Sequence, residues 1–593
     1  MHFGLLDWTV VVSYFVVSLG IGLLFSKRAG RNIEEYFVSA RSLPWWIAGT
    51  SMVATTFAAD TPLAVTGLVV KRGLAGNWLW WAFAVGGMLT VFLYARLWRR
   101  AEVLTDVELI ELRYGGKLAA FLRVFRAVYL ALPINSIIIA WVNFAMLKVL
   151  KVTLVGESVS DWTLLVIMLG ITGFYTMLSG MWGVAITDVV QFVLAIVGCI
   201  VLAVLAVRNV GGVQALHQQI ASVAEGGEHA LRFVPDWSAQ SWLSPTLFLS
   251  YILVMWWASW YPGAEPGGGG YIVQRMASCK DERHSLLATL WFQIAHYCLR
   301  PWPWIIVGFV ALVKYPELRD AQDAGVGYAR VMKDVLPEGL RGLLLTAFFA
   351  AYMSTLSTQI NWGASYLVND VYKRFVVKSA SDKHYAWVSR AASVLILFCG
   401  AYATQFVESV DQAWKLLLAL GGGTGAVFLL RWYWWRINAA AEIAAMVASF
   451  SFFVLIRALG FTKIPGSFLA IEEYQTIAIA LATIIVWLIV MYLTPPESQK
   501  TLQNFFRKVR PASFGWGPIR RAASDVQTDD AIFVPSLIAA GLGVMVIYTV
   551  LPATGAVIFG QYGKAAALLA VGGVCTVGLI VLLRRVGWQK MVQ

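Results

Sequence analysis

Charged residues are scarce in this sequence, and long polar stretches are missing. Asp, Glu, Lys and Arg make up 13 % of the 593 residues, whereas 59 % are hydrophobic, and the mean hydropathy is +0.69. Soluble globular proteins carry about 25 % charged residues. The composition therefore excludes a large soluble protein and predicts a polytopic membrane protein. No loop between the apolar segments is long enough for a soluble catalytic domain.

Paired cysteines and nucleotide-binding motifs are also missing. The cysteines fall in apolar segments or in a predicted cytoplasmic loop, so they indicate neither a disulfide framework nor a CxxC metal site. They are Cys199, Cys279, Cys298, Cys399 and Cys575. The chain contains neither GxxxxGK[ST] nor HExxH, so these motifs indicate neither a P-loop ATPase nor a zinc protease.

Acidic residues are fewer than basic ones, at 33 against 46, which gives a net charge of +13. If the N-terminus lies outside, alternate loops hold about 30 of the basic residues, as expected for cytoplasmic loops. The distribution of the basic residues therefore indicates the membrane topology of the chain, and it does not indicate a nucleic-acid partner. Lys27 and Arg28 follow the first apolar segment, 5–25, and no basic region precedes it. This pattern predicts a retained helix and not a cleaved signal.

The segment 43–70, LPWWIAGTSMVATTFAADTPLAVTGLVV, is apolar and long enough to cross a bilayer, which needs about 20 residues. It carries Asp60, Thr61 and Pro62 in its middle. Because proline lacks the backbone N–H and disfavours the α region at the preceding residue, we expect the helix to open near Asp60. Unpaired backbone groups at this depth must be satisfied by protein, water or an ion, so the break predicts a polar site at mid-membrane.

A second segment, 244–273, is interrupted in the same way, by Pro262, Gly263, Pro266 and the glycines 267–270. Each interrupted helix begins a block of five apolar spans. Paired interruptions at equivalent positions indicate an inverted-repeat secondary transporter with its binding site between the breaks. A kink at a helix packing contact remains the alternative for either break alone.

The expected fold is an all-α polytopic membrane protein with a five-plus-five inverted repeat, one extra N-terminal helix and about four extra C-terminal helices, about fifteen spans in total. Segments 162–178 and 184–207 are expected as a tight helix pair joined by SGMWG, and 414–435 as one span. The divisions are 1–42, an extra helix and a cytoplasmic loop; 43–207, the first repeat; 208–243, an extracytoplasmic loop; 244–436, the second repeat; 437–494, extra helices; 495–530, a cytoplasmic loop without its own core; and 531–593, a terminal helix pair.

Hydroxyl-bearing side chains recur along the apolar segment that follows Pro337. Ala351, Ser354, Thr355 and Thr358 have the spacing that places them on one helical face. Hard cations take oxygen ligands, and hydroxyls together with freed backbone carbonyls would supply them to Na⁺. Small residues also let membrane helices pack closely, so helix packing explains this stripe equally well.

Asp188, in GVAITDVVQFV, lies within an apolar span. An ionisable residue there is rare and costly, which makes it a functional-site hypothesis by default. A bound cation would keep the carboxylate ionised, and a structural acid paired with a neighbouring hydroxyl is the alternative. Asp60 either caps the helix that follows the first break or lines the site.

The motifs around these residues resemble the solute:sodium symporter family, which contains the sodium/glucose, proline, iodide and sialic acid transporters. The resemblance covers about 5–493 and rests on LPWWIAGTSMVATTFAAD, SGMWGVAITDVVQ, YIVQR, LPEGLRGLL, STLST and NDVYK. It implies a leucine-transporter-like fold whose first core helix is 43–70. It also implies alternating access in which Na⁺ enters before the solute.

The resemblance further implies where sodium binds. The site common to the family would use the carbonyls of Ala54, Phe57 and Ala351 and the hydroxyls of Ser354 and Thr355. Some members hold a second sodium on the cytoplasmic side of the first, and Asp188, Ser357 and Thr358 match that pattern. Na⁺ is therefore the expected coupling ion, and no organic cofactor is expected.

The chain departs from the family's sugar transporters where they bind sugar. Trp80 and Trp414 replace a Glu and a Gln, Thr61 replaces the Gln after the first break, and the Lys of the seventh core helix falls near His296. The aromatic gate before YIVQR is replaced by the segment 265–270. These differences leave a glucose-like substrate in doubt.

The remaining candidates for the solute site are Asp60, Thr61, Trp80, Glu265, Gln293, His296 and Trp414, with Trp78 and Arg300 close by in sequence. Tryptophan faces suit sugar rings, aromatic rings or cations, and Arg300 could hold a carboxylate with two hydrogen bonds. An interfacial tryptophan belt explains Trp78 equally well. Histidines such as His296 are more often satisfied within a helix than used as ligands.

The sequence thus predicts a secondary active transporter, and not an enzyme, that couples Na⁺ to the uptake of a sugar, a sugar-derived compound or an organic acid. A membrane solute sensor of the same fold, a proton-coupled symporter that uses Asp188, and a membrane enzyme that uses Asp60, Glu265 and His296 are the alternatives. The expected partners are the solute, Na⁺ and the lipid bilayer, without nucleic acid. We expect a monomer in the cell membrane, with its N-terminus extracytoplasmic and its C-terminus cytoplasmic.

Overall fold

Helices are the only regular secondary structure in the part of the chain that the structure describes. The structure, a computed structural model, describes residues 3–29, 33–223, 227–234, 244–259, 265–461, 464 and 467–585. Every regular element of these ranges is a helix, which confirms the all-α prediction. The first half contains α1 Leu5–Ala29, α2 Ile33–Val38, α3 Trp45–Thr55, α4 Asp60–Arg72, α5 Trp78–Trp81, α6 Ala84–Leu89, α7 Ala95–Ala101, α8 Leu109–Arg113, α9 Gly116–Tyr129, α10 Asn135–Leu150, α11 Asp161–Asn209, α12 Val213–Val223 and α13 Gly227–Ala230.

The second half continues the same architecture. It contains α14 Pro245–Ser250, α15 Trp256–Ala258, α16 Gly270–Ser278, α17 Glu282–Ile294, α18 Pro301–Lys314, α19 Val326–Val335, α20 Leu340–Ser365, α21 Asp382–Thr404, α22 Val410–Leu420, α23 Thr424–Leu430, α24 Ala439–Ala458, α25 Glu472–Leu493, α26 Gln499–Val509, α27 Gly517–Ala522, α28 Asp530–Ile558 and α29 Tyr562–Arg585. Single-turn π-helical stretches such as η4 Leu130–Ile134 and η7 Ala295–Leu299 join several of these into longer spans.

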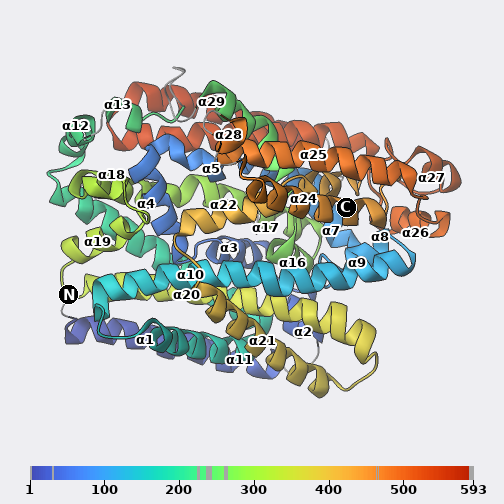
Figure 1. Cartoon of the computed structure of the whole chain (residues 1–593), viewed down its shortest axis with the longest axis horizontal. Coiled ribbons are helices and arrows are strands. Elements are labelled where there is room, and N and C mark those ends of the chain that lie inside the picture. The colour runs from blue at the N-terminus through green and yellow to red at the C-terminus, as the bar shows by residue number, and fades with distance from the viewer. Residues whose placement is uncertain are drawn as a thin grey trace.

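The broken helices α3 and α16 lie in the interior. Figure 1 shows α25, α28 and α29 along one edge of the molecule and α1, α11 and α21 along the opposite edge, with α3 and α16 between them. Nearly all residues of α3, and all of α16, are buried. Breaks in these helices are therefore surrounded by protein and not by lipid, as a polar site in a membrane requires.

Eleven described helices are long and apolar enough to cross a membrane, and the number rises to thirteen if each of two bent pairs forms one span. Shorter apolar helices at 161–177 and 245–258 correspond to the remaining expected spans. The chain is therefore a multi-pass membrane protein. The count of about fifteen spans and the sides on which the termini lie stay predictions.

The helix pair predicted at 162–178 and 184–207 is present as one element, α11. The Tyr175 hydroxyl nevertheless contacts the Thr187 hydroxyl. In a straight helix these residues would lie about 18 Å apart along the axis, so α11 folds back sharply between them. The predicted turn at SGMWG is therefore made of helical residues and not of a loop.

The predicted break in the first core helix is confirmed. α3 ends at Thr55, α4 begins at Asp60, and the two helices are bent by 56°. Pro62 is the third residue of α4, where the backbone N–H has no intrahelical partner, so proline does not disturb the helix there. The break lies at 56–59, just before Asp60, and it frees the last carbonyls of α3.

The second predicted break is also present. α15 ends at Ala258, α16 begins at Gly270, and residues 265–269 between them are not helical. Pro262 and Gly263, which the prediction also used, lie outside the described residues.

A third break, which the sequence interpretation missed, bends α22 against α23 by 58° at the glycines 421–423. Gly423 has φ +87°, a left-handed conformation that favours glycine. Its amide donates to the carbonyl of Ala258 at 2.7 Å, and the Ser259 hydroxyl donates to the carbonyl of Leu418 at 3.0 Å. The span predicted at 414–435 is therefore an interrupted helix whose open end is joined to the second break.

Gly425 of α23 lies so close to the second break that a methyl group does not fit. A Cβ there would be 2.2 Å from the Trp257 carbonyl oxygen and 2.9 Å from Pro266 Cγ. We expect Gly425→Ala to destabilise the protein by about 1–3 kcal/mol, the usual effect of overpacking, and to lower the melting temperature followed by tryptophan fluorescence. Gly541→Ala on α28, with nothing within 4 Å, is the matched control. Equal melting temperatures for the two variants would contradict this close packing.

The segment predicted as a loop at 495–530 contains α26 and α27. Phe505, Phe506 and Trp516 are buried and belong to the main hydrophobic core. Trp516 Nε1 donates to the Trp432 carbonyl at 3.0 Å, and the Arg113 guanidinium lies 4.9 Å from the Trp516 ring centre. The segment is therefore helical and packs against the ends of the membrane helices, without a separate core.

Candidate functional site

The first break meets the hydroxyl-bearing face of α20. Thr355 Oγ1 is 2.8 Å from the carbonyl oxygen of Thr55, the last residue of α3, and 3.2 Å from that of Ala351. The hydroxyls of Thr55 and Thr358 are 3.0 Å apart, and these residues are buried. Carbonyl and hydroxyl oxygens, which hard cations take as ligands, thus converge where the sequence analysis expects sodium.

Ala54 and Phe57 lie at the same break, and each is 2 % exposed. The Phe57 amide donates to the Ala54 carbonyl at 3.0 Å, which closes a tight turn after α3. The carbonyl in contact with Thr355 therefore belongs to Thr55, one residue beyond the predicted Ala54. The last carbonyls of a helix lack intrahelical partners, and this rule could have identified Thr55 from the sequence.

Asp188 of α11 is fully buried between α3 and α20. Its carboxylate accepts hydrogen bonds from the Ser354 hydroxyl at 2.6 Å and from the Ser51 hydroxyl at 2.5 Å. Ser354, which the sequence analysis assigns to the first sodium site, thus bonds to Asp188 and links the two predicted ion sites.

The guanidinium group of Arg275 lies beside the Asp188 carboxylate. Arg275 Nη2 lies 3.6 Å from Asp188 Oδ2, and both side chains have no exposed surface. Arg275 also donates to the hydroxyls of Thr358 at 2.6 Å and Ser51 at 3.0 Å. Arg275 therefore supplies a positive charge at the place predicted for a second sodium.

Arg275, the last residue of the YIVQR motif, was not among the predicted site residues. An arginine inside an apolar span is itself a functional-site signal, and this signal could have paired it with Asp188. Ser357, the remaining residue of the predicted second sodium site, donates to the Ser354 carbonyl of its own helix at 3.1 Å.

Three residues predicted near the solute gather on another side of the first break. Arg300 Nη1 lies 3.0 Å from the Thr56 hydroxyl and 3.3 Å from the Val53 carbonyl oxygen, and its Nη2 donates to the His296 ring. The Trp80 ring lies edge-on to His296, with 5.5 Å between the ring centres. Thr56, which the sequence analysis missed, joins this cluster to the break.

Asp60 and Gln293 each have a buried oxygen without a hydrogen-bond partner in the part of the chain that is described. Asp60 accepts from Trp414 Nε1 at 3.2 Å through Oδ2, whereas Oδ1 has no partner. Gln293 Oε1, one turn before His296, also has none and faces Gly87 of α6. A buried acceptor without a donor costs about 1–3 kcal/mol, and both oxygens lack a compensating hydrogen bond within the residues described.

Three other predicted residues have different surroundings. The Thr61 hydroxyl donates to the Thr56 carbonyl at 3.3 Å, within the break itself. Glu265 lines a separate cavity with Arg126 and residues of α24. Trp78 is 3 % exposed and donates to the Phe233 carbonyl at 2.8 Å, so it packs in the interior and not in an interfacial belt.

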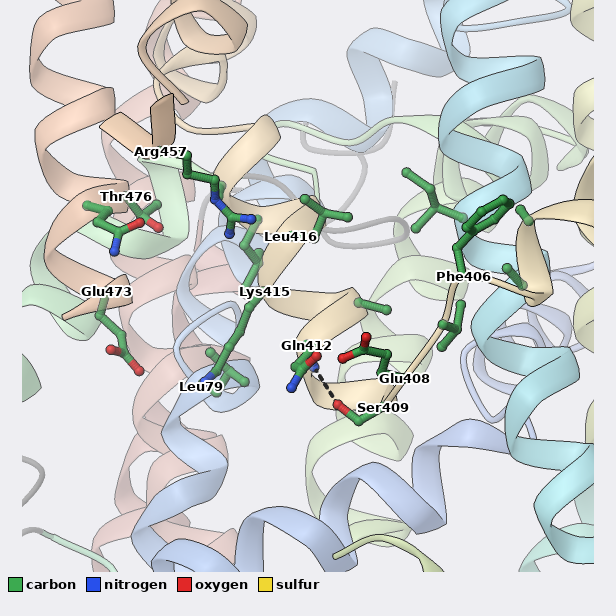
Figure 2. A pocket seen from close by; sticks show the side chains of 18 of the residues that line it. Leu79, Phe406, Glu408, Ser409, Gln412, Lys415, Leu416, Arg457, Glu473 and Thr476 are labelled. Carbon is green, nitrogen blue, oxygen red and sulfur yellow. Dashed lines mark hydrogen bonds between the residues drawn. The ribbon is translucent and has the colours of Figure 1, made fainter. Parts of the chain in front are cut away.

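A cavity of about 470 Å³ opens beside α22, the helix that carries Trp414. Ala413, the chain neighbour of Trp414, lines it. Figure 2 shows Lys415 and Gln412 projecting from α22, with Glu473 on the neighbouring α25. As far as the chain is described, the lining of this cavity contains charged and amide side chains of α22 and α25 but no residue of the solute cluster.

The chain is similar to known transporters over most of its length. The model of the sodium:solute symporter family matches residues 36–449. The sodium/glucose cotransporter of Vibrio parahaemolyticus is 23 % identical over 479 residues, which cover 76 % of this chain and 85 % of that protein. Solute carrier family 5 member 4B of Mus musculus is 26 % identical over 474 residues, which cover 73 % and 69 % of the two chains.

A solved structure supports the fold. A Na⁺-coupled sialic acid symporter in a substrate-bound, outward-open state matches with a TM-score of 0.67 and 21 % identity, over 84 % of this chain and 99 % of that one. This likeness confirms the leucine-transporter-like fold class. The family model matches most of this chain, and the chain therefore belongs to the sodium:solute symporter family.

Proposed function

We propose that this protein binds Na⁺ between Thr355 of α20 and the open end of α3, and uses the inward movement of the ion to carry a small polar organic solute into the cell. The observation that supports this most is the 2.8 Å contact between Thr355 Oγ1 and the Thr55 carbonyl oxygen. It joins the broken helix to the hydroxyl-bearing helix at one point. Relative movement of the two repeats would therefore bring the ion ligands together or separate them, as alternating access requires.

The proposed ion ligands are few, and all of them are neutral oxygen-bearing groups. They are the carbonyls of Thr55 and Ala351 and the hydroxyl of Thr355, with the predicted carbonyls of Ala54 and Phe57 completing the shell. Ser354 would connect this shell to Asp188 through its 2.6 Å hydrogen bond. A second sodium at Asp188, Ser357 and Thr358 would require Arg275 to move away from Asp188.

The solute would lie among Asp60, Trp80, Gln293, His296 and Trp414. The partnerless oxygens of Asp60 and Gln293 need donors, and the hydroxyl groups of a sugar or a sugar-derived compound supply them. The tryptophan rings offer flat apolar faces to such a ring. Arg300 already contacts Thr56 and His296, which makes a hydroxyl-rich solute a better fit than a simple carboxylate. An organic acid is the second candidate.

The driving force would be sufficient for accumulation. One Na⁺ that moves inward down about 100 mV releases about 2.3 kcal/mol. A tenfold sodium gradient adds about 1.4 kcal/mol. Together these correspond to a solute gradient of about 500-fold per ion, since about 1.4 kcal/mol is a factor of ten.

A ligand screen tests this function. Purified protein is heated with sugars, sugar acids, organic acids, amino acids and nucleosides, in NaCl or in choline chloride, and its melting temperature is recorded. We expect one solute class to raise the melting temperature in NaCl alone, because ligands stabilise the state that they bind. The Asp60→Asn variant should lose this shift but keep the shift caused by Na⁺ without solute.

Uptake into proteoliposomes then separates the alternatives. Replacing Na⁺ by choline should abolish uptake, and full uptake without Na⁺ at any pH would contradict sodium coupling. Uptake that follows pH and not Na⁺ would indicate a proton-coupled symporter. Binding without uptake would indicate a sensor, and chemical conversion of the bound solute would indicate an enzyme.

A further inference from the structure

A second cavity, distinct from the solute cluster, opens between α9, α23 and α24. Its volume is about 340 Å³, and its walls are almost entirely apolar. Phe125, Val447 and Phe450 at its rim are 39 %, 54 % and 55 % exposed, whereas Glu265 is 5 % exposed. The rim residues belong to helices long and apolar enough to cross a membrane. The cavity therefore leads from the lipid-facing surface to the buried carboxylate of Glu265.

Among the described residues, no hydrogen bond or ion pair satisfies the Glu265 carboxylate. Arg126 and Arg431 lie within its electrostatic range, but both are held by another acid. Arg126 Nη1 and Arg431 Nη1 lie 2.7 Å and 3.3 Å from Glu442 Oε1. Arg126 also lies 3.6 Å from Asp106. The two arginines thus share their charge among three carboxylates.

Glu265 lies in a cluster of buried acids and arginines. The other acids are Asp106 and Glu442, and the arginines are Arg113, Arg126 and Arg431. Each arginine is hydrogen-bonded or ion-paired to a group other than Glu265. An uncompensated carboxylate in a region of low dielectric is costly unless a cation or a proton joins it. Because the cavity reaches Glu265 from the lipid side, a cation that is itself soluble in the membrane could neutralise it.

We propose that this cavity binds a monovalent amphiphilic cation, with an alkylammonium head on the Glu265 carboxylate and an apolar tail between Phe125 and Phe450. The ammonium group would form a charge-assisted hydrogen bond with Glu265. The Tyr129 ring on the wall provides a face to which cations are attracted. α24, one of the helices outside the ten-helix core, would thus form one wall of a ligand site.

Matched amphiphiles test this site independently of transport. The full-length protein is purified in a neutral maltoside detergent, and its melting temperature is titrated with decylammonium chloride, 1-decanol or sodium decyl sulfate. We expect decylammonium to bind saturably and to raise the melting temperature, whereas the alcohol and the sulfate do not. Glu265→Gln keeps the shape of the side chain. It should weaken the binding of decylammonium at least about tenfold, since hydrogen bonds to charged groups contribute about 1.5–3 kcal/mol.

Two further variants separate this site from general detergent effects. Val447→Trp would fill the rim of the cavity and should abolish the decylammonium shift. Val454→Trp, two turns further along α24 and 44 % exposed, should leave the shift unchanged. Equal binding of decylammonium and 1-decanol would show that a proton, and not a cation, neutralises Glu265 and would overturn the proposal. Unchanged decylammonium binding by Glu265→Gln would also overturn it.

Discussion

Replacing Asp188 with asparagine is expected to destabilise the folded protein by about 3–5 kcal/mol, the usual effect of breaking a buried ion pair. The Arg275 guanidinium has no exposed surface and lies 3.6 Å from the carboxylate of Asp188. Asparagine keeps the size of the side chain and can still bond to Ser51 or Ser354, but it removes the negative charge. The measurement is the midpoint of thermal unfolding at a fixed scan rate, followed by tryptophan fluorescence.

The control is a second substitution that removes the other charge. Asp188→Asn combined with Arg275→Met should recover at least about half of the lost stability, because the coupling between two contacting charges disappears when both are absent. Asp334→Asn breaks an exposed ion pair with Lys314, whose charged atoms are 3.3 Å apart. It should destabilise the folded protein by less than about 1 kcal/mol. A double variant no more stable than Asp188→Asn alone would show that the two charges do not depend on each other.

Thr355→Val should weaken sodium binding by about 10–100-fold while leaving the fold intact. Valine has nearly the same shape but removes the hydroxyl that contacts the carbonyls of Thr55 and Ala351. Loss of one oxygen that faces a charged ligand is worth about 1.5–3 kcal/mol, which gives this range at about 1.4 kcal/mol per tenfold. The measurement is the NaCl concentration that produces half of the maximal rise in melting temperature.

Thr346→Val is the matched control for this substitution. Thr346 is on the same helix and equally buried, and its hydroxyl has no hydrogen-bond partner in the described part of the chain. Its variant should therefore respond to Na⁺ as the wild type does. If both variants lose the sodium response equally, the effect comes from α20 as a whole and not from the Thr355 hydroxyl.

The features of the site that depend on local chemistry could be predicted from the sequence. Pro62 lacks a backbone N–H and disfavours the α region at the residue before it, so a break is expected next to it in a membrane span. A carboxylate such as Asp188 inside an apolar span needs a partner wherever the chain folds. The hydroxyl spacing on α20 follows from helical periodicity alone. The structure confirms the break and places Asp188 in hydrogen-bond contact with Ser354 of α20.

Other features depend on which distant residues meet, and the sequence alone does not contain that information. Arg275 and Asp188 belong to different repeats, so their pairing appears only when the repeats pack together. Glu265 precedes glycines that permit many backbone directions, and its side chain points to the cavity beside α24 and not to the Asp60 cluster. The break at the glycines 421–423 was visible as a glycine run but had no proline to mark it.

Equilibrium binding of radioactive sodium to the purified protein tests the proposed ion site most directly. The proposal predicts saturable binding to the wild type and to Thr346→Val that unlabelled Na⁺ displaces and choline does not, and binding at least about tenfold weaker to Thr355→Val. Radioactive sodium bound as tightly by Thr355→Val as by the wild type would contradict an ion site between α20 and the open end of α3.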